Sequence, residues 1–202
     1  MIRCAKRVGA MKMGGAERLM MVFAVLVVGL VVLERLTRPG GGEATAPLPM
    51  PQLQVEGWLN TAAWEQETSL PSPSVDVLEG QWVVVDCWAS WCPPCLRALP
   101  ELARVKQRWG DKGVVLMGLT PETSEEMAAI QQAVDRVEGF DWPVAYGGLL
   151  VLDKLSVVAY PTLILYDPQG KSVWRGHLVS DLEKQLDKRI AAPEELSGEP
   201  GA

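Results

Sequence analysis

Apolar residues follow two different patterns along the chain. Near the N-terminus, residues 19–33 form one uninterrupted apolar stretch without a single charged residue. From Trp82 onward, short runs of β-branched and other apolar residues alternate with longer segments of helical character. The pattern therefore predicts an N-terminal membrane segment followed by a domain of alternating strands and helices, the α/β class.

Residues 19–36 are predicted to be a transmembrane signal anchor. The stretch is shorter than the roughly 20 apolar residues that span a bilayer, but Arg18 and Arg35 can extend their side chains to the interface. Basic residues are concentrated before the stretch, so the positive-inside rule places residues 1–18 in the cytoplasm and the later residues outside it. Residues 44–46 have the small-x-small pattern of a cleavage site but lie far past the apolar run, which favours an uncleaved anchor.

The composition changes again after the anchor. Residues 37–51 are rich in glycine and proline, which is typical of a linker. Residues 52–192 are predicted to form one folded domain, and the polar residues 193–202 a flexible tail. The formal charge of −6 argues against a protein that follows nucleic-acid phosphates.

The elements of the domain are predicted from the type and length of each run. Before Trp82, one short strand with a turn at residues 53–60 and a loop at 67–74 are expected. Strand–helix alternation after Trp82 predicts a parallel sheet flanked by helices, and a closing hairpin at residues 161–176 adds an antiparallel edge. The other strands are expected at residues 82–88, 113–120 and 142–146, and the helices at residues 92–110, 123–137, 149–158 and 181–191.

Two cysteines, Cys92 and Cys95, stand at the predicted start of the first long helix. Their spacing of three residues puts the Cα atoms ~5–5.5 Å apart, which suits a disulfide that opens and closes without backbone movement. The helix N-terminus stabilises an anion, so the pKa of Cys92 should fall below the free thiol value of about 8.5. We therefore predict that Cys92 is the attacking thiolate and Cys95 the less exposed, resolving thiol.

Three other roles for this cysteine pair remain open at this stage. A static disulfide that closes so short a loop stabilises a fold less than a long-range one. A zinc half-site needs a second pair of ligands, for which His177 and Cys87 are poor candidates. A copper carrier would need more histidine or methionine near the pair. Redox exchange, with no metal and no cofactor, is the favoured interpretation.

The segment VVVDCWASWCPPC at residues 83–95, Pro100, and the segment AYPTLILYDPQG at residues 159–170 resemble the thioredoxin superfamily. A membrane-anchored single domain with a CPPC motif looks most like its TlpA/ResA-type branch, and the likeness covers roughly residues 52–190. The resemblance implies a thioredoxin fold, with a central mixed β-sheet flanked by helices and preceded by one membrane helix. It also implies an extracytoplasmic, periplasmic-side thiol–disulfide oxidoreductase.

The resemblance also implies roles for single residues. Cys92 and Cys95 match the redox pair of the family. Asp86 matches its buried acid, whose pKa burial should raise and which can take the proton of Cys95. The alternative is that Asp86 turns toward solvent at the strand end. The residues expected to contact the substrate are Trp91, Pro93, Tyr160 and Pro161, the last as the family's cis-proline.

Two positions depart from the family pattern. Ala98 stands where many TlpA/ResA-type proteins have a glutamate, so any tuning by that acid is absent or has moved. Cys87 stands where a large apolar residue is usual. Strand alternation places it on the face opposite Asp86, where we interpret it as a buried, apolar thiol and not as a third redox centre.

The favoured function is the exchange of electrons with disulfides or thiols of client proteins, with this chain as a monomeric reductant. Cytochrome c maturation is an example that the resemblance implies, with electrons supplied by a membrane thiol-electron transporter. One alternative is a non-catalytic module that binds peptides with the same fold. Another is a peroxiredoxin-like thiol peroxidase, which the tryptophans around Cys92 disfavour because that family has Pro and Thr before its cysteine.

Overall fold

The computed structural model describes Gly29 and residues 47–191. The chain divides into two units, residues 1–40 and 41–202, and the second unit contains the sheet, its helices and the cysteine pair. The predicted cytoplasmic segment 1–18, the signal anchor 19–36 apart from Gly29, and the tail 193–202 lie outside the described residues. In the described part of the chain, none of the helices is both long enough and apolar enough to span a bilayer.

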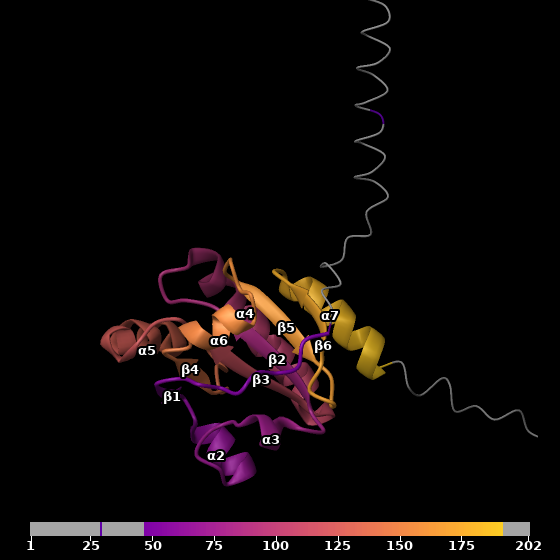
Figure 1. Ribbon diagram of the computed structural model, residues 1–202, viewed down its shortest axis with the longest axis horizontal. Helices are drawn as coiled ribbons and strands as arrows, with labels where there is room; N and C mark the ends of the chain where they lie inside the picture. The colour runs from indigo at the N-terminus through magenta and orange to yellow at the C-terminus, as the bar shows by residue number, and fades with distance from the viewer. Residues whose placement is uncertain (1–28, 30–46, 192–202) are drawn as a thin grey trace, which may run out of the picture. The chain divides into compact units, whose positions relative to one another are not determined.

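A six-stranded mixed sheet forms the centre of the domain, in the order β1-β4-β3-β2-β5-β6 (Figure 1). β2, β3 and β4 are parallel to one another, while β1 pairs antiparallel with β4, and the β5–β6 hairpin pairs antiparallel with β2. The predicted mixed sheet with an antiparallel hairpin is confirmed. The strands are β1 (Gly57–Leu59), β2 (Trp82–Cys87), β3 (Val114–Leu119), β4 (Val144–Tyr146), β5 (Thr162–Tyr166) and β6 (Ser172–Gly176).

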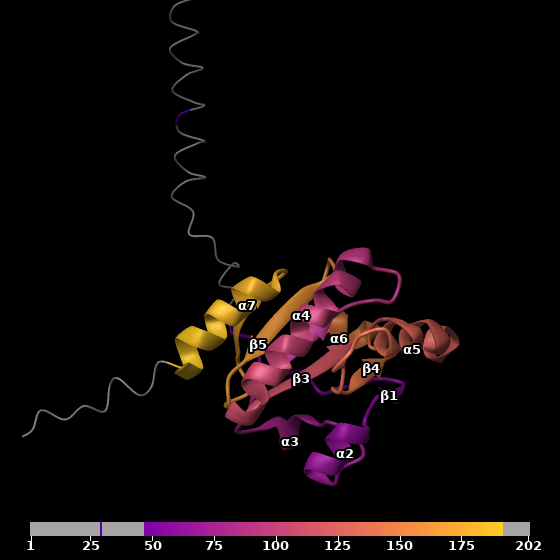
Figure 2. The same ribbon diagram turned by 180° about the vertical axis from the view of Figure 1, so that it is seen from behind.

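Helices cover both faces of this sheet. α4 and α7 pack on one face (Figure 2), and α6 packs on the other (Figure 1). From β2 onward, the order of strands and longer helices is the predicted one. The α-helices are α2 (Ala62–Thr68), α3 (Val75–Leu78), α4 (Pro93–Trp109), α5 (Met127–Asp135), α6 (Leu149–Lys154) and α7 (Val179–Leu186). Two short 3₁₀ helices, η1 (Gly110–Lys112) and η2 (Ser124–Glu126), and a π-helix, η3 (Asp187–Ala191), complete the helical elements of the described residues.

β2 lies in the middle of the sheet, and its alternating side chains enter two separate apolar cores. Val84 belongs to the core under α4, whereas Val83, Val85 and Cys87 belong to the core under α6. Successive side chains of a strand point to opposite faces, so Asp86 follows Val84 toward α4. This placement brings Asp86 to the face of the sheet on which Cys95 is buried.

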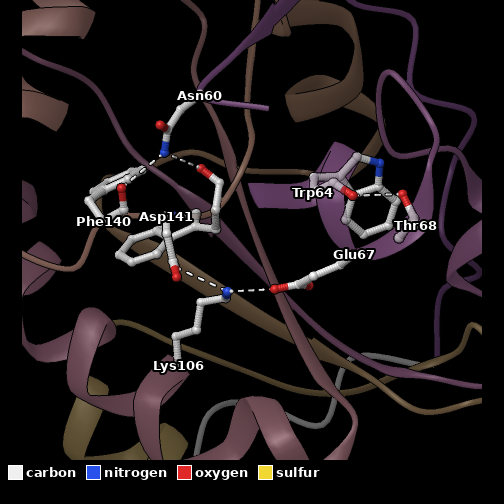
Figure 3. Close-up of polar contacts among 8 residues, drawn as sticks. Asn60, Trp64, Glu67, Thr68, Lys106, Phe140 and Asp141 are labelled. Carbon is white, nitrogen blue, oxygen red and sulfur yellow. Dashed lines mark hydrogen bonds and ion pairs between the residues drawn. The ribbon is translucent and has the colours of Figure 1, made fainter. Parts of the chain in front are cut away.

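The segment before β2 differs from the prediction because it contains two helices, α2 and α3. Trp64 of α2 and Leu78 of α3 are buried in the core under α6, and this burial stabilises helices that are too short to persist alone. Figure 3 shows how α2 is attached to the domain: Lys106 Nζ of α4 lies 3.1 Å from Asp141 and 3.7 Å from Glu67 of α2. The local sequence pattern did not predict α2 and α3, because the contacts that stabilise them are made with residues far away in the chain.

Residues 48–50, which the composition assigns to the linker, pair with the β5–β6 hairpin. The backbone groups of Leu48 and Met50 form hydrogen bonds of 2.9 Å with Ser172 and Gly170. Met50 is buried against the core under α6. β6 is an edge strand, and the backbone groups on the outer side of such a strand can pair even with a proline-rich segment. The folded domain therefore extends to Leu48.

Candidate active site

Cys92 and Cys95 are joined by a disulfide at the start of α4. Their Cα atoms are 5.3 Å apart, within the range that the helical spacing predicts. Cys92 is the N-cap residue, and its sulfur accepts a hydrogen bond of 3.3 Å from the Cys95 N–H. Pro93 occupies the first helical position, where its missing N–H leaves no hydrogen bond unmade. The helix N-terminus thus presents one N–H donor, that of Cys95, and its dipole to the Cys92 sulfur.

Trp91 directly precedes Cys92 and contacts Tyr160, which lies in the loop before β5. Trp91 is 64% exposed, and its ring meets that of Tyr160 edge-on, with centroids 5.8 Å apart. The Tyr160–Pro161 peptide bond is cis. The loop reaches the site because Thr162, which follows it, pairs with Cys87 at the end of β2. Two segments far apart in the sequence therefore form one surface.

Asp86 is buried beneath this surface and has an unusual environment. It is 2% exposed, which excludes the alternative that it faces solvent. Neither carboxylate oxygen has a hydrogen-bond partner within residues 47–191. Burial without a compensating partner raises the pKa of Asp86 from its ordinary value of 3.8 to about 7. The carboxyl can therefore take up or release a proton near neutral pH.

Cys87 lies on the opposite face of the sheet from Asp86, as strand alternation predicts. Its side chain is completely buried in the core under α6 and is a free thiol. Burial raises the pKa of Cys87, the negative charge of Asp86 raises it further, and Arg175 opposes the change only in part. A thiol that is inaccessible and protonated is a poor nucleophile, so Cys87 serves as a small apolar side chain.

Sequence reasoning missed four exposed apolar residues at the end of the sheet where Cys92 lies, which are Leu149, Leu150, Val158 and Leu178. Together with Trp91, which the sequence analysis predicted as a substrate contact, we call them the apolar rim. These are five of the six large apolar side chains that are exposed in the described residues, and Val158 is 96% exposed. All five lie in segments that follow β2, β4 or β6 or precede β5, and these strand ends are all at the same end of the sheet. Apolar residues in a sequence are expected to be buried, so no local signal marks the four residues other than Trp91 as surface residues.

Sequence reasoning also missed Glu122, a buried carboxylate directly beyond β3 that contacts the turn before Cys92. His177 is a further neighbour, because its Nδ1 lies 2.6 Å from the carbonyl oxygen of Pro161. Neither residue belongs to a recognisable motif. Only the folding of β3 and β6 alongside β2 and β5 brings them to the site.

The mixed sheet, the C-x-x-C disulfide at a helix start and the cis-proline directly before β5 together define a thioredoxin-fold protein with a dithiol/disulfide site. The chain belongs to the AhpC/TSA family, whose sequence model matches residues 65–175, more than half of its length. A thiol:disulfide interchange protein from a Bacteroides species has the same fold, with a TM-score of 0.59 and 21% identity over 75% of this chain and 93% of that one.

Two proteins with similar sequences are both named thiol-disulfide oxidoreductase ResA. Thiol-disulfide oxidoreductase ResA of Halalkalibacterium halodurans is 31% identical over 97 residues, which is 48% of this chain and 53% of that protein. ResA of Bacillus subtilis is 29% identical over 97 residues, 48% of this chain and 52% of that protein. The chain is thus similar to ResA-type members of the thioredoxin superfamily, and the match spans about half the length of these relatives.

Proposed function

We propose that this protein is a membrane-anchored thiol–disulfide oxidoreductase that reduces disulfides of client proteins outside the cytoplasm. The observation that carries the proposal is the Cys92–Cys95 disulfide at the α4 N-terminus, together with the carboxyl of Asp86, which is buried on the same face of the sheet as Cys95 and has no hydrogen-bond partner within residues 47–191. The first feature favours a thiolate on Cys92, and the second supplies a proton acceptor near neutral pH. The similarity to proteins named thiol-disulfide oxidoreductase supports the same chemistry.

The reaction begins from the dithiol form. The Cys92 thiolate attacks one sulfur of a client disulfide, a mixed disulfide forms, and the other client sulfur leaves as a thiolate. Cys95 then loses its proton to Asp86 and attacks the Cys92 sulfur, which releases the second client thiolate. Two electrons pass to the client, the Cys92–Cys95 disulfide is restored, and the client thiolates take up protons.

Each further turnover needs an external dithiol to reduce Cys92–Cys95 again. We propose that a membrane thiol-electron transporter supplies it, because the compartment outside the cytoplasm does not keep thiols reduced. Residues 19–36 would hold the domain at the membrane, where such a donor acts. A disulfide of an apocytochrome c is the client that the ResA-type resemblance suggests.

The direction of electron flow can be tested with the full chain at equilibrium in glutathione redox buffers. A reduction potential of Cys92–Cys95 well below about −200 mV supports a reductant, because thioredoxin lies on that side of the scale. A potential close to that of strong oxidants would overturn the reducing direction and leave the exchange chemistry in place. Quenching with acid and alkylating the free thiols gives the fraction reduced.

The apolar rim is expected to bind client segments. Substitution of Val158 by aspartate should lower kcat/KM for a protein disulfide about tenfold, because burying a valine is worth about 1.5 kcal/mol and each 1.4 kcal/mol is tenfold. The free energy of unfolding of the Val158→Asp protein should not change, since Val158 is 96% exposed. Leu70→Asp is the control, because Leu70 is the sixth exposed apolar residue and follows α2. Leu70 is only 37% exposed, so urea unfolding of this variant must first show that it is folded. Equal effects of both substitutions would contradict client binding at the rim.

A further inference from the structure

Glu122 forms a compact hydrogen-bond network with the turn that precedes Cys92. Its side chain is 6% exposed and lies directly beyond β3. Oε2 accepts a hydrogen bond of 2.8 Å from the Ser90 N–H and another of 2.8 Å from the Thr120 hydroxyl. Oε1 accepts a hydrogen bond from the Ser90 hydroxyl. One carboxylate therefore binds both donor groups of Ser90.

Ser90 is part of the turn that delivers Cys92 to the helix start. The Cys92 N–H donates to the Ala89 carbonyl at 3.1 Å, so Ser90 and Trp91 are the central residues of a four-residue turn. The turn begins just after the Trp88 N–H, which donates to the carbonyl of Leu119 at the end of β3. The connection between β2 and α4 is thus bound at two points, to β3 through the Trp88 and Leu119 backbone groups and to the segment after β3 through Glu122.

A carboxylate suits this position better than a neutral side chain. Three donors converge on Glu122, and an ionised carboxylate has two oxygens with room for all three, whereas an amide has one oxygen and would turn its NH₂ group toward a donor. Hydrogen bonds to an ionised acceptor are also stronger than neutral ones. Burial is the main cause that raises the pKa of Tyr160, and the negative charge of Glu122 is one of the smaller contributions.

We propose that Glu122 is a positioning residue for the redox reaction. By binding both donors of Ser90, it holds the turn in the shape that keeps the Cys92 sulfur at the α4 N-terminus and Trp91 against Tyr160. This role deepens the proposed function and rests on it. Glu122 does not contact the reacting sulfurs in this arrangement and acts only through the turn.

The test measures the acidity of Cys92 in the full chain. The Cys95→Ser protein is reduced, treated with iodoacetamide over a range of pH, and the peptide that contains Cys92 is quantified by mass spectrometry. In this background, Glu122→Gln should raise the pH midpoint of alkylation by about one unit, because the sulfur loses its alignment with the helix N-terminus. Loss of a negative charge alone would lower the midpoint, so the sign separates positioning from a simple field effect.

Three further variants sharpen this test. Glu122→Asp keeps the charge but is one methylene too short, so it should behave like Glu122→Gln. Ser90→Ala removes one donor and should shift the midpoint in the same direction by a smaller amount. Combining Ser90→Ala with Glu122→Gln should add nothing to Glu122→Gln alone, because both act through one contact. Ser90→Ala is the milder change and carries the test if Glu122→Gln does not fold.

Glu126→Gln is the matched control, since Glu126 lies in the same segment but is exposed and hydrogen-bonds Thr123. It should leave the alkylation midpoint unchanged. A native midpoint in Glu122→Asp, or additive effects of the Ser90 and Glu122 substitutions, would overturn the positioning role. Alkylation does not need a client, so a protein without exchange activity but with the expected shifts would disprove the proposed function and not the role of Glu122.

Discussion

Replacing Cys92 with serine should abolish disulfide exchange, so that insulin reduction by dithiothreitol proceeds at the uncatalysed rate. A serine hydroxyl does not form a mixed disulfide, and Cys95 is less exposed than Cys92, at 1% against 4%, and does not occupy the N-cap position of α4. The measurement is insulin turbidity with time, with native protein and variant at equal concentration. Cys95→Ser should instead accumulate the mixed disulfide, which non-reducing electrophoresis detects.

The matched control for Cys92→Ser is Cys87→Ala. Cys87 is completely buried on the face of the sheet opposite Asp86, so the Cys87→Ala protein should have the exchange rate of the native protein. Undiminished insulin reduction by Cys92→Ser would contradict the assignment of Cys92 as the nucleophile. Unchanged function in cells when both Cys92 and Cys95 are serine would indicate a peptide-binding module, and peroxide consumption coupled to dithiol oxidation would indicate a thiol peroxidase.

Replacing Asp86 with asparagine should remove a large pH dependence of stability. The pKa of Asp86 is about 7 in the folded protein and 3.8 when the group is unperturbed, so the folded state holds the proton more tightly. The contribution of Asp86 to stability is therefore fully present below pH 3.8 and is lost as pH rises through about 7. Each pKa unit is worth about 1.4 kcal/mol, which makes the loss about 4 kcal/mol.

Urea unfolding from about pH 4 to about pH 8 measures this linkage. The free energy of unfolding of Asp86→Asn, relative to the native protein, should rise by about 4 kcal/mol across that range. Asp153→Asn is the control, because Asp153 is exposed on α6, and its curve should run parallel to the native one. If the free energy of unfolding of the native protein rises as the pH passes through about 7, the assignment of a raised pKa to the buried Asp86 carboxyl is wrong.

The same Asp86→Asn substitution should slow the release of the client. Without a proton acceptor, Cys95 must ionise unaided, and the loss of a general base is expected to slow resolution about 100-fold. In the native protein this step should accelerate as pH rises through about 7, where Asp86 becomes ionised, and the variant should lack that rise. Single-turnover decay of a Cys92 mixed disulfide measures the step, and an unchanged rate would exclude Asp86 as the base.

The sequence by itself determined the local chemistry of this protein. Strand alternation separated Asp86 from Cys87, and the helix start after β2 put Cys92 and Cys95 one turn apart, because both patterns follow from the covalent geometry of a single element. The apolar and β-branched runs also predicted the order of elements from β2 to α7. These features need no knowledge of which strands pair.

Only the tertiary structure decided what surrounds the disulfide. Tyr160 meets Trp91 because β5 pairs with β2, and Glu122 reaches Ser90 because β3 pairs with β2 on its other side. The residues of the apolar rim lie at one end of the sheet because β2, β4 and β6 end there and β5 begins there. The helix α2 forms because Trp64 is buried in the core under α6. Contacts between distant segments depend on strand order and on burial against remote partners, which periodicity within a single segment does not encode.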